Sequence, residues 1–293
     1  MQQQLLAKMS GFLSNNFYLV IACISVLWSV FSTFDNTSIE ETEYKFAQTD
    51  NLLKTKEINE VELRQLPKYR LEIDSKIRRS STGTAFYIGD NKWLTARHVI
   101  NECPQVFLEQ SSTKQLIERI IIHPNSDLAI FDHPPNSLKG EFGLATDVSA
   151  TSFSSGYPGG NPGDVTLSFV GFAAMEERGY NILEKHTVFA ISEKEPRLLV
   201  SFGGISGGPS YDGFGNVNGV IVAESVRRGL LYAVSIGQIS WLIAASKKSG
   251  VSPFDAKDKK TENLLISLDS TSFNEVGKEL RANGIVRKVF CKV

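Results

Sequence analysis

Short apolar runs separated by turn residues fill the middle of the chain. Between about residues 68 and 245, runs of four to six mostly apolar positions alternate with Gly, Pro, Asn and Asp. The runs are 84–88, 92–95, 128–131, 165–170, 197–201, 217–222 and 230–235. Many short strands at such spacing are typical of β-barrels and sandwiches. No long helical pattern lies between them, which disfavours a βαβ fold. The pattern predicts an all-β domain over residues 71–249.

A different pattern precedes this domain. No charged residue lies between Lys8 and Asp35, and residues 17–31 are almost continuously apolar. A membrane-spanning helix needs about 20 mostly apolar residues, so we expect a transmembrane anchor at residues 11–34. Positive charge ahead of the segment predicts a cytoplasmic N-terminus at residues 1–10 and an extracytoplasmic domain. A cleaved signal peptide is the alternative, although residues 32–35 are a poor cleavage site.

The flanks of the β domain read differently from its centre. Residues 35–70 are polar and acidic, and they predict a juxtamembrane linker with an amphipathic helix over 50–66. A short closing helix is expected at 239–247. Residues 250–293 predict a linker and a small C-terminal βαβ extension, with strands at 264–268 and 285–293 around a helix at 272–283. Ser272 and Glu275 fit a capping box, and Gly284 fits a helix stop.

Charge and cysteine content narrow the function classes. The 31 basic and 32 acidic residues give a net charge of −1, which argues against a dedicated nucleic-acid-binding protein. Three cysteines are too few for a disulfide scaffold and fit no dense zinc-ligand spacing. We therefore expect no metal site. Cys103 and Cys291 either pair, if the domain lies outside the cytoplasm, or remain free buried thiols.

Three motifs carry candidate chemistry. His98 follows the apolar run 92–95, Asp127 opens the run 128–131, and Ser206 lies within Gly203-Gly-Ile-Ser-Gly-Gly-Pro209. A serine hydroxyl is a weak nucleophile that needs an adjacent base. Histidine titrates near neutrality and can take and return that proton. A carboxylate fixes the imidazole tautomer and stabilises the imidazolium. The three residues therefore predict a catalytic Ser-His-Asp triad.

Glycines around the serine have a second use. Because they lack a Cβ atom, backbone N–H groups can converge on one point beside the nucleophile. We expect the N–H groups of Gly204 and Ser206 to form an oxyanion hole. Losing one such donor typically costs about 3 kcal/mol of transition-state stabilisation.

Chain order excludes a competing arrangement. Gly204-Ile-Ser-Gly-Gly208 also matches the G-x-S-x-G elbow of α/β-hydrolases. That fold needs its histidine after the serine, and all four histidines precede Ser206. Asp132 competes with Asp127 for the acid position, but it ends its apolar run. His123 and His133 flank prolines and His186 lies in a polar stretch, so all three are expected in loops.

Taken together, the motifs resemble those of trypsin-like serine proteases. The sequence is similar to the bacterial HtrA-like branch in Thr95-Ala-Arg-His98, Asp127-Leu-Ala-Ile, Gly156-Tyr-Pro-Gly-Gly160 and Gly204-Ile-Ser-Gly-Gly-Pro209. The resemblance implies two six-stranded antiparallel β-barrels with the site between them. It also implies cofactor-free endopeptidase activity on protein or peptide substrates. Anchored members are trimeric, which implies a homotrimer in a bacterial inner membrane, spanning once, with the protease domain in the periplasm.

The resemblance also locates a specificity pocket, near Val200, Ile221, Val222 and Ala223. These residues are apolar, which predicts a small or medium apolar side chain before the cleaved bond, unless Glu224 turns inward. HtrA-like proteins often carry a C-terminal PDZ domain. The stretch after Val251 is shorter than one, so none is expected. The rival hypothesis is a catalytically silent protease-fold module that binds peptides along a strand edge.

Overall fold

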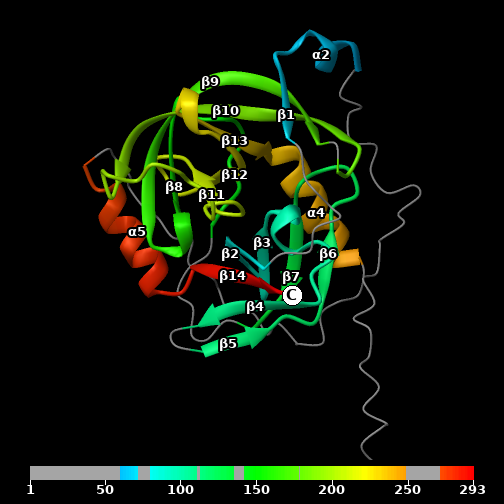
Figure 1. Ribbon diagram of the computed structural model, residues 1–293, viewed down its shortest axis with the longest axis vertical. Helices are drawn as coiled ribbons and strands as arrows, with labels where there is room; N and C mark the ends of the chain where they lie inside the picture. The colour runs from blue at the N-terminus through cyan, green and yellow to red at the C-terminus, as the bar shows by residue number, and fades with distance from the viewer. Residues whose placement is uncertain (1–59, 72–79, 111–112, 135–141, 178, 249–270) are drawn as a thin grey trace, which may run out of the picture. The chain divides into compact units, whose positions relative to one another are not determined.

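The computed structural model describes residues 60–71, 80–110, 113–134, 142–177, 179–248 and 271–293. Its strands form two antiparallel sheets, apart from one parallel strand, which confirms the all-β prediction (Figure 1). The expected anchor at 11–34, most of the linker at 35–70 and the expected strand at 264–268 lie outside the described residues. Among the helices that are described, none has both the length and the apolarity to span a bilayer.

The second sheet closes into a six-stranded barrel. Its strands are β8 (Thr151–Gly156), β9 (Gly163–Glu177), β10 (Ile182–Glu195), β11 (Pro209–Tyr211), β12 (Val217–Ser225) and β13 (Leu230–Ser235). They follow the order β8-β9-β10-β13-β12-β11, and β11 pairs back to β8. Strand β1 (Lys68–Leu71), which follows helix α2 (Glu60–Gln65), adds to β9 in parallel. Closure leaves the ring without an unpaired edge strand.

The first sheet has seven strands and curls without closing. In sheet order they are β5 (Thr113–Leu116), β4 (Gln105–Gln110), β14 (Val286–Lys292), β2 (Ser81–Gly89), β3 (Lys92–Thr95), β7 (Ala129–Asp132) and β6 (Ile120–Ile122). The prediction of two six-stranded barrels is therefore correct for one sheet only. The end strands β5 and β6 have four and three residues, so they offer few main-chain groups for a closing ladder, and within the described ranges they do not pair with each other.

The C-terminal segment is an integral part of the fold, which corrects the expectation of a separate βαβ extension. Strand β14 lies between β2 and β4 and pairs antiparallel with both (Figure 1). A disulfide between Cys103 and Cys291 joins its end to the loop before β4. The sequence signalled the strand but not its neighbours, because strand pairing across this distance leaves no local pattern.

Helix α5 (Phe273–Ala282) holds the same segment against the barrel. It lies beside β8 and β9 (Figure 1). Arg281 donates two hydrogen bonds, of 2.6 and 2.8 Å, to the carboxylate of Asp164 on β9. Both side chains are buried, so the bidentate geometry is needed to offset their desolvation. The C-terminal segment thus bridges the two sheets.

The apolar core also crosses from one sheet to the other. The ring of Phe142 lies 5.9 Å from that of Phe86 on β2 and 5.6 Å from that of Tyr211 on β11. Helix α4 (Ile236–Lys248) covers β7, β12 and β13 and buries Ile239 and Leu242. A shared core fixes the two sheets against each other, which is the condition for building one site from residues of both.

Candidate active site

His98 and Asp127 meet on the first sheet. Strand β3 ends at Thr95, and His98 lies in the first turn of the short helix α3 (Arg97–Ile100). Asp127 lies just before β7, the neighbour of β3. Its carboxylate accepts two hydrogen bonds from His98, one from the backbone N–H at 2.8 Å and one from ring Nδ1 at 2.6 Å. Because Nδ1 donates to Asp127, the Nε2 lone pair remains available as a base.

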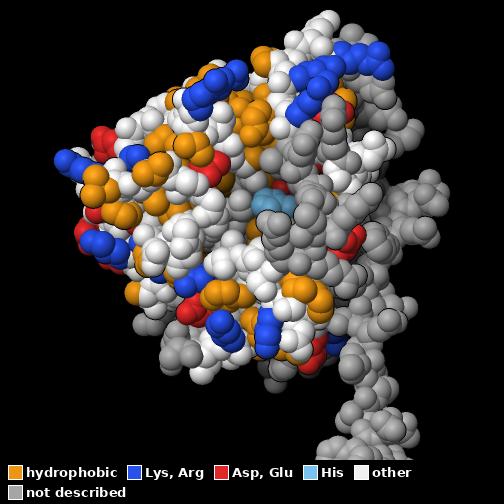
Figure 2. Space-filling view, viewed as in Figure 1, with side chains coloured by type: hydrophobic (Ala, Val, Ile, Leu, Met, Phe, Trp, Pro, Cys, Tyr) orange, Lys and Arg blue, Asp and Glu red, His pale blue; other side chains and the backbone are white. Residues whose placement is uncertain are grey.

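Electrostatics poise this pair for proton transfer. Burial acts to lower the pKa of His98, but the Asp127 carboxylate more than offsets it and holds that pKa above its usual value. Burial acts to raise the pKa of Asp127, and the charge and hydrogen bonds of His98 more than offset it, so that pKa is lowered. Asp127 is fully buried, whereas the His98 side chain is 24% exposed. Histidine surface is visible near the centre of the face shown in Figure 2.

The backbone contacts of its glycines place the Ser206 loop beside this pair. A Cβ atom on Gly207 would lie 2.4 Å from Thr95 Oγ1 and 2.8 Å from the N atom of Ala96. A Cβ atom on Gly83 would touch both the side chain of Val99 and the carbonyl of Ser206. The loop therefore packs against the residues on either side of His98. Ser206 lies in the loop that leads into β11 of the second sheet, whereas His98 and Asp127 belong to the first sheet.

Hydrogen bonding leaves two N–H groups of this loop free. From 202 to 208 every other N–H has an acceptor within the described structure: the amides of 202, 203, 205, 207 and 208 donate to Glu224 Oε2, Ser201 Oγ, Phe202 O, Ile221 O and Ile205 O. Within the described hydrogen bonds, the N–H groups of Gly204 and Ser206 donate to none. These are the two groups that the sequence predicts as the oxyanion hole.

Thr84 on β2 holds the peptides that directly follow these two N–H groups, a role that sequence reasoning missed. Its N–H donates to the carbonyl of Ser206 at 2.8 Å, and its hydroxyl donates to the carbonyl of Gly204 at 2.8 Å. The same hydroxyl accepts the N–H of Tyr157 at 3.1 Å. Fixing both carbonyls also fixes the peptide planes beside the two free N–H groups. The available signal was a short polar residue directly before the apolar run 85–88.

Glycine at position 204 is required by this geometry. Its φ is +100°, and a Cβ atom there would lie 2.6 Å from the carbonyl of Tyr157. The 3₁₀ turn η1 (Pro158–Gly160) contacts the same peptide, since the N–H of Gly159 donates to the carbonyl of Gly203 at 2.6 Å. The Gly-Tyr-Pro loop that the sequence singled out therefore supports the Ser206 loop.

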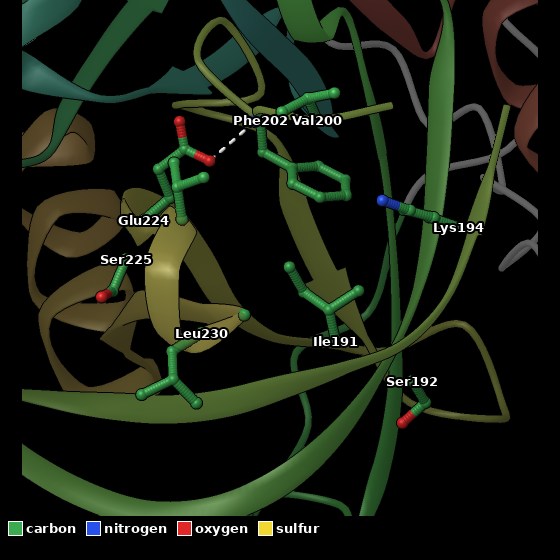
Figure 3. A pocket seen from close by; sticks show the side chains of 10 residues that line it. Ile191, Ser192, Lys194, Val200, Phe202, Glu224, Ser225 and Leu230 are labelled. Atoms are coloured by element: carbon green, nitrogen blue, oxygen red, sulfur yellow. Dashed lines mark hydrogen bonds between the residues drawn. The ribbon is translucent and has the colours of Figure 1, made fainter. Parts of the chain in front are cut away.

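A pocket of about 250 Å³ lies beside the stretch that leads to the Ser206 loop (Figure 3). Val200, Phe202, Ile191 and Leu230 give it apolar walls, and Lys194 and Glu224 add charged groups. Both oxygens of Glu224 are already engaged, because Oε1 accepts Ser201 Oγ at 2.5 Å and Oε2 accepts the N–H of Phe202 at 2.7 Å. The carboxylate thus braces the pocket wall.

The predicted pocket residues separate into two groups. Val200 lines the pocket and is 78% exposed. Ile221, Val222 and Ala223 are buried and do not line it. Ile221 packs in the barrel interior with Phe189 and Phe202. Glu224 and Ser225, at the end of β12, face the pocket in their place.

The remaining histidines are buried. His123 and His133 lie outside the strands, as expected, and the ring of His123 packs 4.4 Å from that of Trp241. Burial and the nearby Arg97 lower the pKa of His123 to about 3. His186 lies on β10 rather than in the expected loop, because the strand there pairs with both β9 and β13. None of the three contacts the His98–Asp127 pair through a described hydrogen bond.

Comparison with known proteins gives structural likenesses only. No family model and no curated protein matches the chain. Among solved structures, the active form of Rv3671c protease from M. tuberculosis is 18% identical with a TM-score of 0.47, covering 56% of this chain and 72% of that one. HtrA-type protease AlgW with a decapeptide is 17% identical with a TM-score of 0.46, covering 56% and 51%. The serine endoprotease of Yersinia pestis is 15% identical with a TM-score of 0.40, covering 60% of each. Each of these three similar structures is that of a protease.

Proposed function

We propose that the chain is a serine endopeptidase that hydrolyses peptide bonds through an acyl-enzyme. Two observations carry the proposal. His98 is hydrogen-bonded to Asp127, and in the neighbouring Ser206 loop the N–H groups of Gly204 and Ser206 have no acceptor among the described hydrogen bonds. A base, a nucleophile and two unpaired donors in one place are the parts that acyl transfer needs.

The chemistry follows from these groups. His98 Nε2 takes the proton of the Ser206 hydroxyl as the oxygen attacks the scissile carbonyl carbon. The carbonyl oxygen becomes negative and accepts hydrogen bonds from the N–H groups of Gly204 and Ser206. The imidazolium, stabilised by Asp127, gives its proton to the leaving amine as the C–N bond breaks. Water then enters by the same route, and hydrolysis of the ester restores the serine.

The pocket supports a preference for apolar side chains of moderate size before the cleaved bond. Val200, Phe202 and Leu230 offer apolar contact. Both carboxylate oxygens of Glu224 already accept hydrogen bonds from Ser201 and Phe202. Glu224 is therefore poorly placed to bind a basic side chain of the substrate. A volume of about 250 Å³ accommodates one side chain rather than a large ligand.

We further propose that the enzyme is anchored by one helix in a bacterial inner membrane, with this domain in the periplasm. The uncharged stretch between Lys8 and Asp35 supports the anchor. The Cys103–Cys291 disulfide supports an oxidising compartment. We also propose a role in protein quality control or regulated proteolysis, and assembly as a homotrimer. Both rest on the resemblance to anchored HtrA-like proteases.

Covalent labelling tests the catalytic proposal. A fluorophosphonate probe should modify the full chain at Ser206, and Ser206→Ala should abolish labelling. Ser240→Ala, which removes an exposed hydroxyl on helix α4, is the matched control and should label like the wild type. Equal labelling of Ser206→Ala and wild type would refute the proposal.

A catalytically silent peptide-binding module is the second candidate. One observation favours it: the described hydrogen bonds include none between Ser206 Oγ and His98. Active enzymes without substrate often lack this bond as well, so turnover decides. Comparing cleaved protein termini in cells that carry wild type or Ser206→Ala should reveal fragments that only the wild type makes. Peptide binding without any such fragments would establish the silent module.

A further inference from the structure

A buried polar cluster lies on the inner face of the β9–β10 hairpin. Glu177 ends β9, and Glu184 and His186 lie on β10. The register pairs 177 with Ile182, 184 with Met175, and 186 with Ala173. Alternate positions of paired strands share a face, so the three side chains point the same way. Glu177 and His186 are fully buried, and Glu184 is 3% exposed.

The polar atoms of this cluster converge without partners. One candidate ligand atom from each residue lies within 4.8 Å of the other two. Within the described residues, both carboxylate oxygens of Glu177, Oε2 of Glu184 and Nε2 of His186 are buried with no hydrogen-bond partner. A buried polar atom without a partner costs about 1–3 kcal/mol. Three buried residues that bring such atoms this close together indicate that a ligand lies between them.

Neighbouring groups orient these atoms. Ser126 Oγ donates to Glu184 Oε1 at 2.7 Å, which leaves Oε2 free. The ring nitrogen Nδ1 of His186 lies 3.4 Å from the carbonyl of Glu184. A carbonyl only accepts, so Nδ1 is the donor and Nε2 carries a lone pair. That lone pair faces Glu184 Oε2 at 3.6 Å. Two acceptors opposite each other need a cation or a proton between them.

We propose that Glu177, Glu184 and His186 bind a divalent transition-metal ion, with Zn²⁺ the best match. One imidazole and two carboxylates are a ligand set that zinc accepts, with bond lengths of about 2.0–2.2 Å and a fourth position open to water. The Nδ1 hydrogen bond of His186 and the Ser126 bond to Glu184 are the outer contacts that commonly orient such ligands.

The position of the site suggests a structural role for the ion, separate from the proposed catalysis. Ser126, which holds Glu184, precedes Asp127 in the chain. A divalent ion would balance the negative charges that this part of the fold buries behind the His98–Asp127 pair. Its ligand Glu184 already joins the β9–β10 hairpin of the second sheet to the loop that carries Asp127, through the Ser126 hydrogen bond. Metal binding is independent of whether Ser206 reacts.

Metal analysis of the full chain tests the proposal. The protein, purified in detergent with its disulfide intact, is treated with a chelator and then titrated with Zn²⁺ alone. Elemental analysis after gel filtration should find one zinc per chain. The melting temperature should rise with the logarithm of the free zinc concentration once the site fills. Substitution with Co²⁺ should give the visible absorption bands of a four-coordinate site.

Isosteric variants separate binding from folding. Glu184→Gln and Glu177→Gln should weaken zinc affinity by at least about tenfold and remove the thermal shift, while the far-UV circular dichroism stays that of the folded chain. Glu176→Gln is the matched control, because Glu176 lies on the opposite face of β9 and pairs with the exposed Arg70. It should bind zinc like the wild type. Failure of the wild type to retain zinc, or equal shifts in wild type and Glu184→Gln, would overturn the proposal.

Discussion

The Thr84 hydroxyl donates a 2.8 Å hydrogen bond to the carbonyl of Gly204, across 120 residues of sequence. It joins the first sheet to the Ser206 loop of the second. We predict that Thr84→Val, which keeps the shape but removes the hydroxyl, lowers kcat by about tenfold or more while KM changes little, because the two N–H donors lose their alignment. It should also lower the free energy of unfolding by about 1–3 kcal/mol, since buried partners lose their bonds.

Thr84→Ser provides the control for this prediction. Serine keeps the hydroxyl and loses only a methyl group, so kcat should stay close to the wild-type value. Steady-state kinetics on a peptide substrate and urea unfolding measure the two effects. Wild-type kcat in Thr84→Val would show that the Gly204 peptide is held by other contacts.

The His98–Asp127 pair predicts how activity depends on pH. His98 acts as a base only when neutral, and Asp127 holds its pKa above the usual 6.5. The value of kcat/KM should therefore rise with pH through a midpoint above 6.5 and be lost below it. Asp127→Asn removes the carboxylate and leaves burial as the largest remaining influence on the pKa of His98, so the midpoint should move below 6.5. Its kcat should fall by about 10⁴.

Asp132→Asn is the matched variant for this test. Asp132 pairs with Lys92 at 2.9 Å and has no described bond to His98. Its loss should leave the pH midpoint unchanged, whatever it does to stability. A pH–rate profile that shifts in Asp132→Asn and not in Asp127→Asn would reverse the assignment of the acid.

The buried Glu184 predicts that the chelator-treated protein loses folding stability as the pH rises. Burial raises the pKa of Glu184 from an ordinary value of 4.5 to about 8. Between these values the unfolded chain releases a proton that the folded chain keeps, so stability falls as pH rises from about 4.5 to about 8 and then levels off. The slope from this one group reaches about 1.4 kcal/mol per pH unit.

Glu184→Gln removes the titrating group and should flatten the profile over the same range. Denaturant unfolding at several pH values in the presence of a chelator measures the difference. Equal slopes for Glu184→Gln and wild type would mean that Glu184 ionises in the folded state as it does in the unfolded chain.

The Cys103–Cys291 disulfide closes a segment of 188 residues. Cross-links over long segments stabilise mainly by restricting the unfolded chain, and removing a native one typically costs about 2–5 kcal/mol. Cys291→Ser should therefore lower the free energy of unfolding by that amount, and reduction of the wild type should have the same effect. Cys103→Ser and the double variant should match Cys291→Ser, because each removes the same bond. Additive losses in the double variant would show that the two thiols act separately.

The barrel pocket shows why the sequence could not predict which side chains of β12 point into the pocket. Ile221, Val222 and Ala223 belong to an apolar run, and a regular strand would turn alternate members outward. The pairing of β12 with β13 shifts register between 221 and 223. A bulge of this kind changes which side chains face each side of the sheet, so Glu224 and Ser225 reach the pocket and Ile221 turns into the barrel.

The sequence by itself determined the class of fold and predicted the reactive groups. His98, Asp127 and Ser206 stand in local patterns that carry their own chemistry, and short apolar runs between turns predict strands. Tertiary structure alone decided the neighbours: β14 between β2 and β4, Thr84 behind Gly204, and Glu177 with Glu184 and His186. The physical reason is the distance along the chain over which each interaction acts. Strand propensity and turn chemistry act over a few residues, whereas strand pairing and side-chain burial are settled by the whole chain at once.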